Sequence, residues 1–364
     1  MEMSQKTKRA ADLALLRELS LGFGPTGCED EIRARIAREI APLGYETMTD
    51  TLGNLLVRVR IGKGGPRLMI SAHMDEVGLM VTDIDKEGYL RFDTVGGIDA
   101  SVMAGRKVTL GDEHTQIRGV ICSKAIHHKS KKEREKAVPI DQLYMDIGAT
   151  SREESEAVAP VGTFGTFDSE FYTFGKDHRM VKGKALDDRM GCAALLEVLR
   201  ALKDNPPAGN FELYACFTVR EEIGLSGAKV AAQRLSPDYA LVLETTAVGD
   251  IAEVAPAKRV ADVGQGGVLS LMDRATVYDR AFVDFLLATA GEEGIAAQVK
   301  RYVSGGNDAG SIHKTGTGVR TAALSVPTRY LHSPACVASL DDYEAVRDLC
   351  ESAVRHFPTL ISEE

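Results

Sequence analysis

The chain of 364 residues contains no tryptophan and only six cysteines. The absence of tryptophan disfavours an aromatic surface on which bases or sugars stack. None of the cysteines forms a Cys-x-x-Cys pair, the spacing that would indicate a redox or zinc motif. Scattered cysteines in a chain of this length are typical of a reduced, intracellular protein in which they pack as small apolar side chains.

Long apolar runs and excess positive charge are also missing. No stretch reaches about 18 uninterrupted apolar residues, so no transmembrane helix is expected. The first residues lack the apolar core of a signal peptide, because Asp12, Arg17 and Glu18 interrupt the leucines. We therefore expect a cytoplasmic protein. The 44 Lys and Arg residues against 53 Asp and Glu give a net charge of −9, which disfavours nucleic acid and anionic membranes as partners.

What is present is the composition of a globular protein, 44% hydrophobic and 27% charged. Apolar residues at helical spacing predict helices over 8–20 and 29–40, and strands follow over 54–60 and 67–72. From about 77 to 177, short alternating runs are broken by glycine and aspartate, which is typical of a small β domain. After that, the pattern predicts alternating helices and strands over 187–202, 210–219, 239–243, 280–293, 318–326 and 341–356.

This order predicts an α/β fold with parallel strands, because helices that alternate with strands form crossover connections. We expect a discontinuous catalytic domain of residues 1–76 and 178–364. Residues 77–177 would form a small β-rich domain inserted into it.

Several acidic residues and histidines lie where a predicted strand ends or a helix begins. In an open α/β sheet the carboxyl ends of the strands converge on one crevice, so these side chains can meet. Imidazoles and carboxylates together suit zinc or another divalent first-row ion, and a bridging carboxylate lets five ligands hold two ions. Asp75, two residues beyond His73, could orient its imidazole. The five candidate ligands are His73, Asp187, Glu222, Glu244 and His332.

These segments closely resemble the M42 family of metallo-aminopeptidases, the tetrahedral-assembly aminopeptidases. The resemblance runs through nearly the whole chain, and the combination of motifs is highly specific. Residues 305–310 (Gly-Gly-Asn-Asp-Ala-Gly) are similar to the family's Gly-Gly-Thr-Asp-Ala-Gly segment, and residues 325–330 lead to the last histidine as they do in the family. Further similar segments are 24–29, 50–55, 95–97 and 143–148.

The resemblance implies a dinuclear metal centre and gives each residue a role. His73, Asp187 and Glu244 would hold one ion, and Asp187, Glu222 and His332 would hold the other, with Asp187 as the bridge. Glu221 would be the general base and Asp75 would support His73. Zinc is the expected metal, although cobalt and manganese share such ligands.

The implied activity is that of an aminopeptidase that removes N-terminal residues from peptides. Two divalent ions lower the pKa of a shared water, so a metal-bridged hydroxide would attack the peptide carbonyl. Glu221 would take the proton and return it to the departing amine. The family's insert mediates dimerisation, so the resemblance also implies a homo-oligomer, up to a tetrahedral dodecamer.

Three positions depart from the family pattern, and other functions stay open. Glu244 stands where the family usually has Asp, Asn307 replaces Thr, and Arg320 replaces Pro. The preferred N-terminal residue does not follow from the sequence. A related dinuclear hydrolase, either an N-deacylase or a carboxypeptidase, would use the same metals. A glycosidase would need the carboxylates but not the histidines. A non-catalytic assembly protein would not need the complete ligand set.

Overall fold

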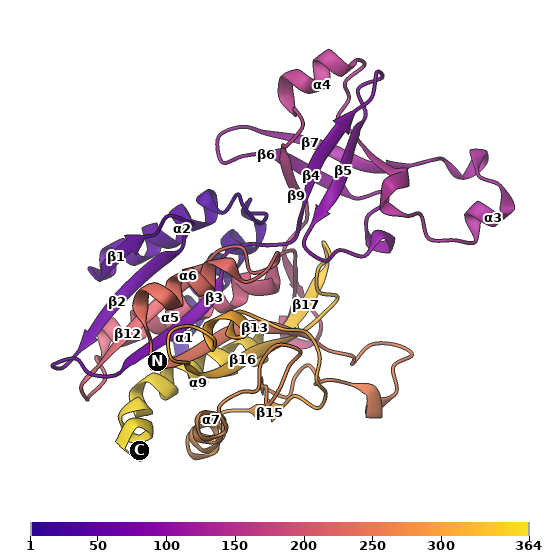
Figure 1. The fold of residues 1–364 in the computed structure, drawn as a ribbon. Coiled ribbons are helices and arrows are strands. Elements are labelled where there is room, and N and C mark those ends of the chain that lie inside the picture. Colours follow the sequence, from indigo (N-terminus) through magenta and orange to yellow (C-terminus); the bar gives the residue numbers. More distant parts are fainter. Residues whose placement is uncertain (1, 363–364) are drawn as a thin grey trace.

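The computed structural model describes residues 2–362, without the side chains of 2–11, 132 and 133 (Figure 1). Within this part of the chain, an eleven-stranded sheet is built around four parallel strands in the order β12, β3, β13 and β16. They are Phe211–Thr218 (β12), Arg67–His73 (β3), Tyr239–Ala247 (β13) and Arg320–Arg329 (β16). The α/β fold with parallel strands predicted from the sequence is confirmed.

The margins of this sheet are antiparallel except for the pairing of β14 (Gly267–Leu269) with β15 (Ala297–Val299), and the sequence pattern did not predict this. On one side, β2 (Leu55–Ile61) pairs with β12, and β1 (Glu46–Thr49) pairs with β2. The other strands lie beyond or beside β16, and each is only three or four residues long. They are β17 (Cys336–Ser339), β11 (Met180–Gly183), β10 (Tyr172–Phe174), β14 and β15. Strands this short carry too few residues to display an alternating pattern.

Helices cover both faces of the sheet (Figure 1). On one face, α5 (Leu186–Asp204) packs on β3 and β13, α1 (Glu2–Leu21) packs on α5, and α9 (Leu340–Ser362) packs on β16. On the opposite face, α6 (Ser226–Leu235) packs on β12, and α8 (Ala309–Ile312) contacts α6. The remaining long helices are α2 (Asp30–Ile40) and α7 (Arg280–Glu293). Every helix predicted from the sequence is present.

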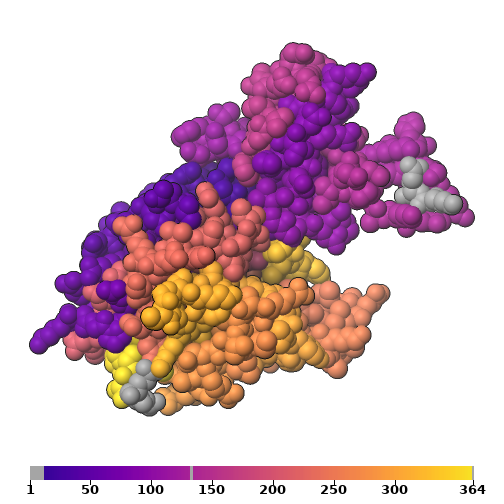
Figure 2. Space-filling view, in the orientation of Figure 1, coloured from indigo at the N-terminus to yellow at the C-terminus, as the bar shows by residue number. Residues whose placement is uncertain are grey.

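A six-stranded closed barrel forms a separate lobe above the sheet (Figure 2). Its strands are β4 (Gly78–Ile84), β5 (Leu90–Val95), β6 (Lys107–Gly111), β7 (Gln116–Ser123), β8 (Leu143–Asp146) and β9 (Phe164–Phe167). In β6 and β8 every second residue is buried, and apolar side chains from all six strands fill the barrel interior. Two short helices, α3 (Lys131–Arg134) and α4 (Arg152–Val158), lie on its connections.

The barrel strands end at Phe167, and β10 (Tyr172–Phe174) already pairs within the large sheet. The division of the chain at 77 and 177 stays a prediction. Among residues 2–362, none of the helices combines the length and apolar character needed to cross a membrane.

Candidate active site

The ends of the parallel strands meet around one cleft of about 550 Å³. His73 is the last residue of β3, and Glu244 lies in the carboxyl half of β13. Glu222 and His332 follow β12 and β16 in the next turns, and Asp187 enters from the start of α5. The structure therefore brings together the five residues that the sequence analysis proposed as metal ligands.

Asp187 lies between the two histidines. Its Oδ1 is 3.2 Å from His73 Nε2, and its Oδ2 is 3.4 Å from His332 Nε2. A second carboxylate accompanies each imidazole, with Glu244 Oε1 3.4 Å from His73 Nε2 and Glu222 Oε2 3.4 Å from His332 Nε2. The site thus consists of two groups, each of one imidazole and two carboxylates, that share Asp187.

These separations fit a divalent ion in each group. Zinc binds imidazole nitrogen and carboxylate oxygen at about 2.1 Å, and two ligands of a tetrahedral ion are then about 3.4 Å apart. The nitrogen–oxygen distances of 3.2–3.4 Å match that value. The donor set of nitrogen and oxygen atoms also suits zinc and its first-row neighbours.

The second nitrogen of each histidine is held by a backbone carbonyl. His73 Nδ1 lies 3.0 Å from the carbonyl oxygen of Asp75, and His332 Nδ1 lies 2.7 Å from that of Gly97. A donated Nδ1–H leaves Nε2 with its lone pair facing the carboxylates, as a metal ligand requires. Gly97 lies just after β5, so the barrel lobe supplies one of the two orienting groups.

Burial, neighbouring charges and hydrogen bonds shift the pKa values of the carboxyl groups and histidines in this cluster. Burial raises the pKa of Glu222 and of Glu244 to about 8, and the charge of Asp187 adds to both shifts. Burial opposes ionisation of Asp187, but hydrogen bonds from His332 and His73 outweigh it and hold the pKa of this carboxyl below its usual range. For His332, burial is outweighed by Asp187 and Glu222, which raise the pKa to about 9.

Two carboxylate oxygens in the cluster remain without partners. Glu222 Oε1 and Asp188 Oδ2 are buried, and no donor among the described residues reaches either atom. Burying an ionised carboxylate costs several kcal/mol unless a cation or donors compensate it. The cluster therefore needs positive charge that the described side chains do not supply.

Asp75 has a wider role than the orientation of His73. Its Oδ1 accepts the backbone N–H of Glu221 at 3.0 Å, and its Oδ2 accepts the N–H of Glu222 at 3.2 Å and the hydroxyl of Thr26 at 2.7 Å. Its carboxylate is farther from His73 Nδ1, at 3.5 Å, than its own carbonyl oxygen is. The carboxylate thus holds the turn that carries both glutamates.

Glu221 lines the same cleft but differs from its neighbour Glu222. Its carboxylate makes no hydrogen bond with any described residue, and burial raises its pKa well above the usual range despite the opposing charge of His73. A carboxylate that is near the metal groups and is not held by another side chain can accept and return a proton.

Sequence reasoning missed Asp188. One oxygen of its carboxylate lies within 4.8 Å of ligand atoms of both His73 and Glu244, and its Oδ1 accepts the N–H of Gly191 at 2.9 Å. Its position directly after Asp187 was the available signal, but adjacent acidic residues are common at helix starts. The distinguishing property is its complete burial, which appears only in the folded chain.

Asn307 and Arg320, two of the three positions that depart from the family pattern, differ in whether they line the cleft. Asn307 lines the cleft, where its Nδ2 donates to Tyr278 Oη at 3.0 Å. Arg320 lies at the opposite end of β16 and donates to Tyr239 Oη at 3.1 Å. Asn307 is thus placed to contact a substrate, whereas Arg320 is remote from the cleft.

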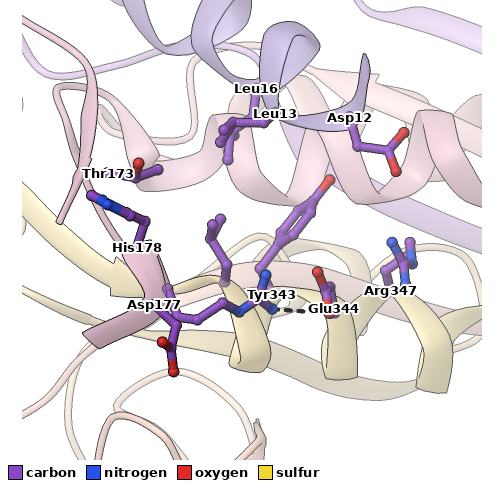
Figure 3. A pocket seen from close by; sticks show the side chains of 11 residues that line it. Asp12, Leu13, Leu16, Thr173, Asp177, His178, Tyr343, Glu344 and Arg347 are labelled. Carbon is purple, nitrogen blue, oxygen red and sulfur yellow. Dashed lines mark ion pairs between the residues drawn. The ribbon is translucent and has the colours of Figure 1, made fainter. Parts of the chain in front are cut away.

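A smaller cavity of about 260 Å³ lies between α1, α9 and the segment that runs from β10 to Arg179, and it contains none of the predicted site residues (Figure 3). Both arginines in its lining form ion pairs within the chain. Arg179 pairs with Glu344 at 3.0 Å, and Arg347 pairs with Glu197 at 2.9 Å. The predicted metal-binding carboxylates of the cleft differ, because they contact histidines and pair with no lysine or arginine among the described residues.

Comparisons with known proteins agree with the geometry. Residues 53–349 match the family model described as M42 glutamyl aminopeptidase. A lysyl aminopeptidase from Pyrococcus furiosus is 31% identical over 92% of this chain and 94% of its own length.

Solved structures of similar proteins share the fold over almost the entire chain. A TET aminopeptidase from the marine sediment archaeon Thaumarchaeota archaeon SCGC AB-539-E09 has a TM-score of 0.93 and 33% identity, covering 98% of this chain and 99% of that one. The TET1 peptidase of Pyrococcus horikoshii has a TM-score of 0.83 and 33% identity, covering 94% and 98%. The family match and these relatives agree with the cluster of carboxylates and histidines described above: the chain belongs to the M42 glutamyl aminopeptidase family and is an aminopeptidase.

Proposed function

We propose that this aminopeptidase removes N-terminal residues from peptides at a dinuclear metal centre in the cleft. The observation that carries the proposal is the position of Asp187, whose two oxygens face the two imidazoles at 3.2 and 3.4 Å. That arrangement suits a carboxylate shared between two ions.

His73, Asp187 and Glu244 would hold one ion, and Asp187, Glu222 and His332 would hold the other. Zinc is our first choice, and cobalt and manganese accept the same donors. Once bound, such ions polarise the peptide carbonyl and lower the pKa of a water molecule. Asp187 fixes the spacing of the two groups, and the carbonyls behind His73 and His332 fix the ring orientations.

Glu221 would move the proton. Its raised pKa allows its carboxylate to hold a proton taken from the attacking water until the amine departs. Asp75 positions Glu221 through the backbone N–H and so keeps its side chain at the cleft wall.

The charge of the cleft favours an ammonium over a carboxylate as the group to be recognised. Five carboxylates lie together here, and two divalent ions would neutralise four of them, so one negative charge remains for the free amino terminus. A carboxypeptidase would require a cation for the substrate carboxylate in the same place, and an N-deacylase would receive an uncharged acyl group. The five are Asp187, Asp188, Glu221, Glu222 and Glu244.

The test is hydrolysis of aminoacyl p-nitroanilides, their N-acetylated forms and an N-blocked carboxypeptidase substrate, each with and without chelator. Cleavage of the free-amine compounds alone, lost with chelator and restored by zinc or cobalt, is the expected result. Release of acetate from the acetylated compounds would indicate an N-deacylase, and release of the C-terminal residue from the N-blocked peptide would indicate a carboxypeptidase. Either result would contradict the proposal.

We also propose that residues 77–177 form an inserted domain through which copies of the chain associate. The TET1 peptidase of Pyrococcus horikoshii can assemble into a tetrahedron or a large octahedral shell, and this chain shares its fold. Light scattering after size-exclusion chromatography will show a dodecamer if the proposal is correct and a monomer if it is wrong. A cytoplasmic location is proposed because all six cysteines are free.

A further inference from the structure

The cavity between α1, α9 and the segment from β10 to Arg179 lies outside the cleft, and the proposed reaction does not use it. Its volume is about 260 Å³, and none of its lining residues also lines the cleft. Pockets that hold drug-sized ligands have volumes of about 300–1,000 Å³, so this cavity fits a smaller molecule. The side chains around it indicate the chemistry of that molecule.

Part of the cavity lining is apolar. Leu13 and Leu16 extend from α1 toward α9, and Tyr343 extends from α9 toward α1 (Figure 3). Tyr343 donates its hydroxyl group to Glu197, so its ring is the part left to contact a ligand. Leu340, the first residue of α9, completes this part of the lining. These side chains favour an aliphatic group, because apolar surface is stabilised when it leaves water.

An ion pair lines the same cavity. Arg179 Nη2 lies 3.0 Å from Glu344 Oε2, and the two side chains are only 21% and 24% exposed. Arg179 Nε donates to Asp341 at 2.7 Å, but no described residue accepts a hydrogen bond from Arg179 Nη1. A guanidinium has five N–H donors, and a carboxylate accepts about four hydrogen bonds. Both partners of this pair can therefore also bind a ligand.

The ion pair complements the zwitterion of an α-amino acid. The ammonium and the carboxylate of such a molecule are attached to the same carbon atom, so together they can reach two opposite charges that lie 3.0 Å apart. Hydrogen bonds between charged groups are short and strong, which favours this arrangement. A carboxylic acid or an amine alone would satisfy only one of the two charges.

The walls of the cavity are held in place by the sheet. The backbone N–H of Leu340 donates to the carbonyl oxygen of Arg179 at 2.8 Å. This contact continues the antiparallel pairing of β11 with β17. A site whose walls are already ordered loses less free energy when its ligand binds.

We propose that this cavity is a second binding site of the protein, for a free amino acid with an aliphatic side chain such as leucine. Glu344 binds the ammonium, Arg179 binds the carboxylate, and the side chain lies against the leucines of α1. An aminopeptidase releases molecules of this class, so the enzyme binds its own product at a place separate from its cleft. The inference does not depend on the proposed metal centre, because no predicted metal ligand lines the cavity.

The experiment measures binding of radiolabelled leucine to the zinc-loaded full chain by equilibrium dialysis. Leu13→Phe and Thr173→Phe fill the cavity from two different walls, α1 and β10. Each variant should bind about one leucine per chain less than the wild type, because the added ring occupies the space of the ligand. Leucine that binds in the cleft contributes equally to all variants, so the difference between them measures binding in the cavity.

Two analogues test the recognition of the zwitterion. 4-Methylpentanoate lacks the ammonium, and 3-methylbutylamine lacks the carboxylate. Each should compete for the binding that Leu13→Phe removes about tenfold less well than unlabelled leucine does, the usual value of a hydrogen bond to a charged group.

Ala14→Phe is the matched control, since it adds the same side chain to α1 at an exposed position outside the cavity; it should bind as much leucine as the wild type. Circular dichroism and hydrolysis of an aminoacyl p-nitroanilide will show that each variant is folded. If the wild type binds no leucine, or if the two filled variants bind as much as it does, the inference is wrong. Equal competition by either analogue would overturn the proposed recognition of the zwitterion. None of these results bears on the proposed function, which the hydrolysis assays test separately.

Discussion

Two clusters of buried charged residues lie side by side in this protein, and their charges are compensated in different ways. One contains Glu76, Lys184 and Arg189, and the other contains the proposed metal ligands. The two clusters are also close along the chain, because Glu76 follows Asp75 directly and Lys184 precedes Asp187 by three residues.

The first cluster is satisfied by the chain itself. Lys184 Nζ donates to the two oxygens of Glu76 at 2.6 and 2.8 Å and to the carbonyl of Gly22 at 2.8 Å, which uses all three of its donors. Arg189 adds a contact to Glu76 at 3.4 Å, although its Nε lacks a partner among the described residues. Thr166 of the barrel strand β9 donates to Glu76 at 2.7 Å. This cluster joins the sheet, the helices and the barrel.

The second cluster contains more carboxylates than the described side chains can compensate, and two of its buried oxygens have no donor. The comparison shows how a structural cluster of buried charge differs from a binding site. In the structural cluster, opposite charges meet within the chain; in the binding site, the compensating charge must come from outside. Substitutions in the two clusters should therefore have different effects, which the following predictions test.

The largest expected effect is that of Asp187→Ala on activity. Because Asp187 contributes an oxygen to both groups, its loss should impair both metal positions and lower kcat/KM by about a thousandfold or more. Metal content, measured by mass spectrometry, should fall to less than half of the wild-type value. The metal-free protein should unfold at a lower temperature than the metal-free wild type, because the two histidines lose the carboxylate whose ionised form they stabilise. Full metal content in this variant would contradict the bridging role.

Glu221→Gln should separate proton transfer from metal binding. The amide cannot accept a proton, so kcat should fall by about a hundredfold to ten-thousandfold. Metal content should stay at the wild-type value, since Glu221 is not among the proposed ligands. Glu292→Gln, on the exposed side of α7, is the control and should leave kcat unchanged. If Glu221→Gln loses metal, then this residue is a ligand and another group must act as the base.

Glu76→Ala should affect stability more than chemistry. It leaves the charges of Lys184 and Arg189 buried without their carboxylate, which should lower the free energy of unfolding by about 3–5 kcal/mol. Urea unfolding of the metal-free protein will measure this change, and Glu87→Ala, at an exposed turn of the barrel, is the control. A change of less than about 1 kcal/mol would mean that this cluster behaves like a surface ion pair.

The two clusters also differ in how far the sequence predicted them. The metal ligands were predictable, because each lies at the end of a strand or the start of a helix and their residue types favour metal binding. Glu76, Lys184 and Arg189 were not, because their role depends on contacts between segments about 110 residues apart in the chain. Asp188 and Gly97 were missed for the same reason, since burial and a carbonyl direction are properties of the folded chain. The short strands at the sheet margin likewise owe their pairing to their neighbours.

The smallest expected effect tests the position at which the metal cluster departs from its family. Glu244→Asp restores the residue that the family usually has, but it removes one methylene from a side chain whose Oε1 lies 3.4 Å from His73 Nε2. The shorter carboxylate should draw back from that group, because β13 fixes its backbone between β3 and β16. We expect the affinity for zinc to fall by about tenfold and kcat at saturating zinc to change less than threefold. Titration with a zinc-buffered chelator will give the affinity. Glu222→Asp is the matched comparison, since Glu222 lies in a turn rather than a strand and can follow the change. If Glu244→Asp binds zinc more tightly than the wild type, the backbone of β13 is closer to the metal position than the side-chain distances indicate, and the longer side chain is the less favourable ligand.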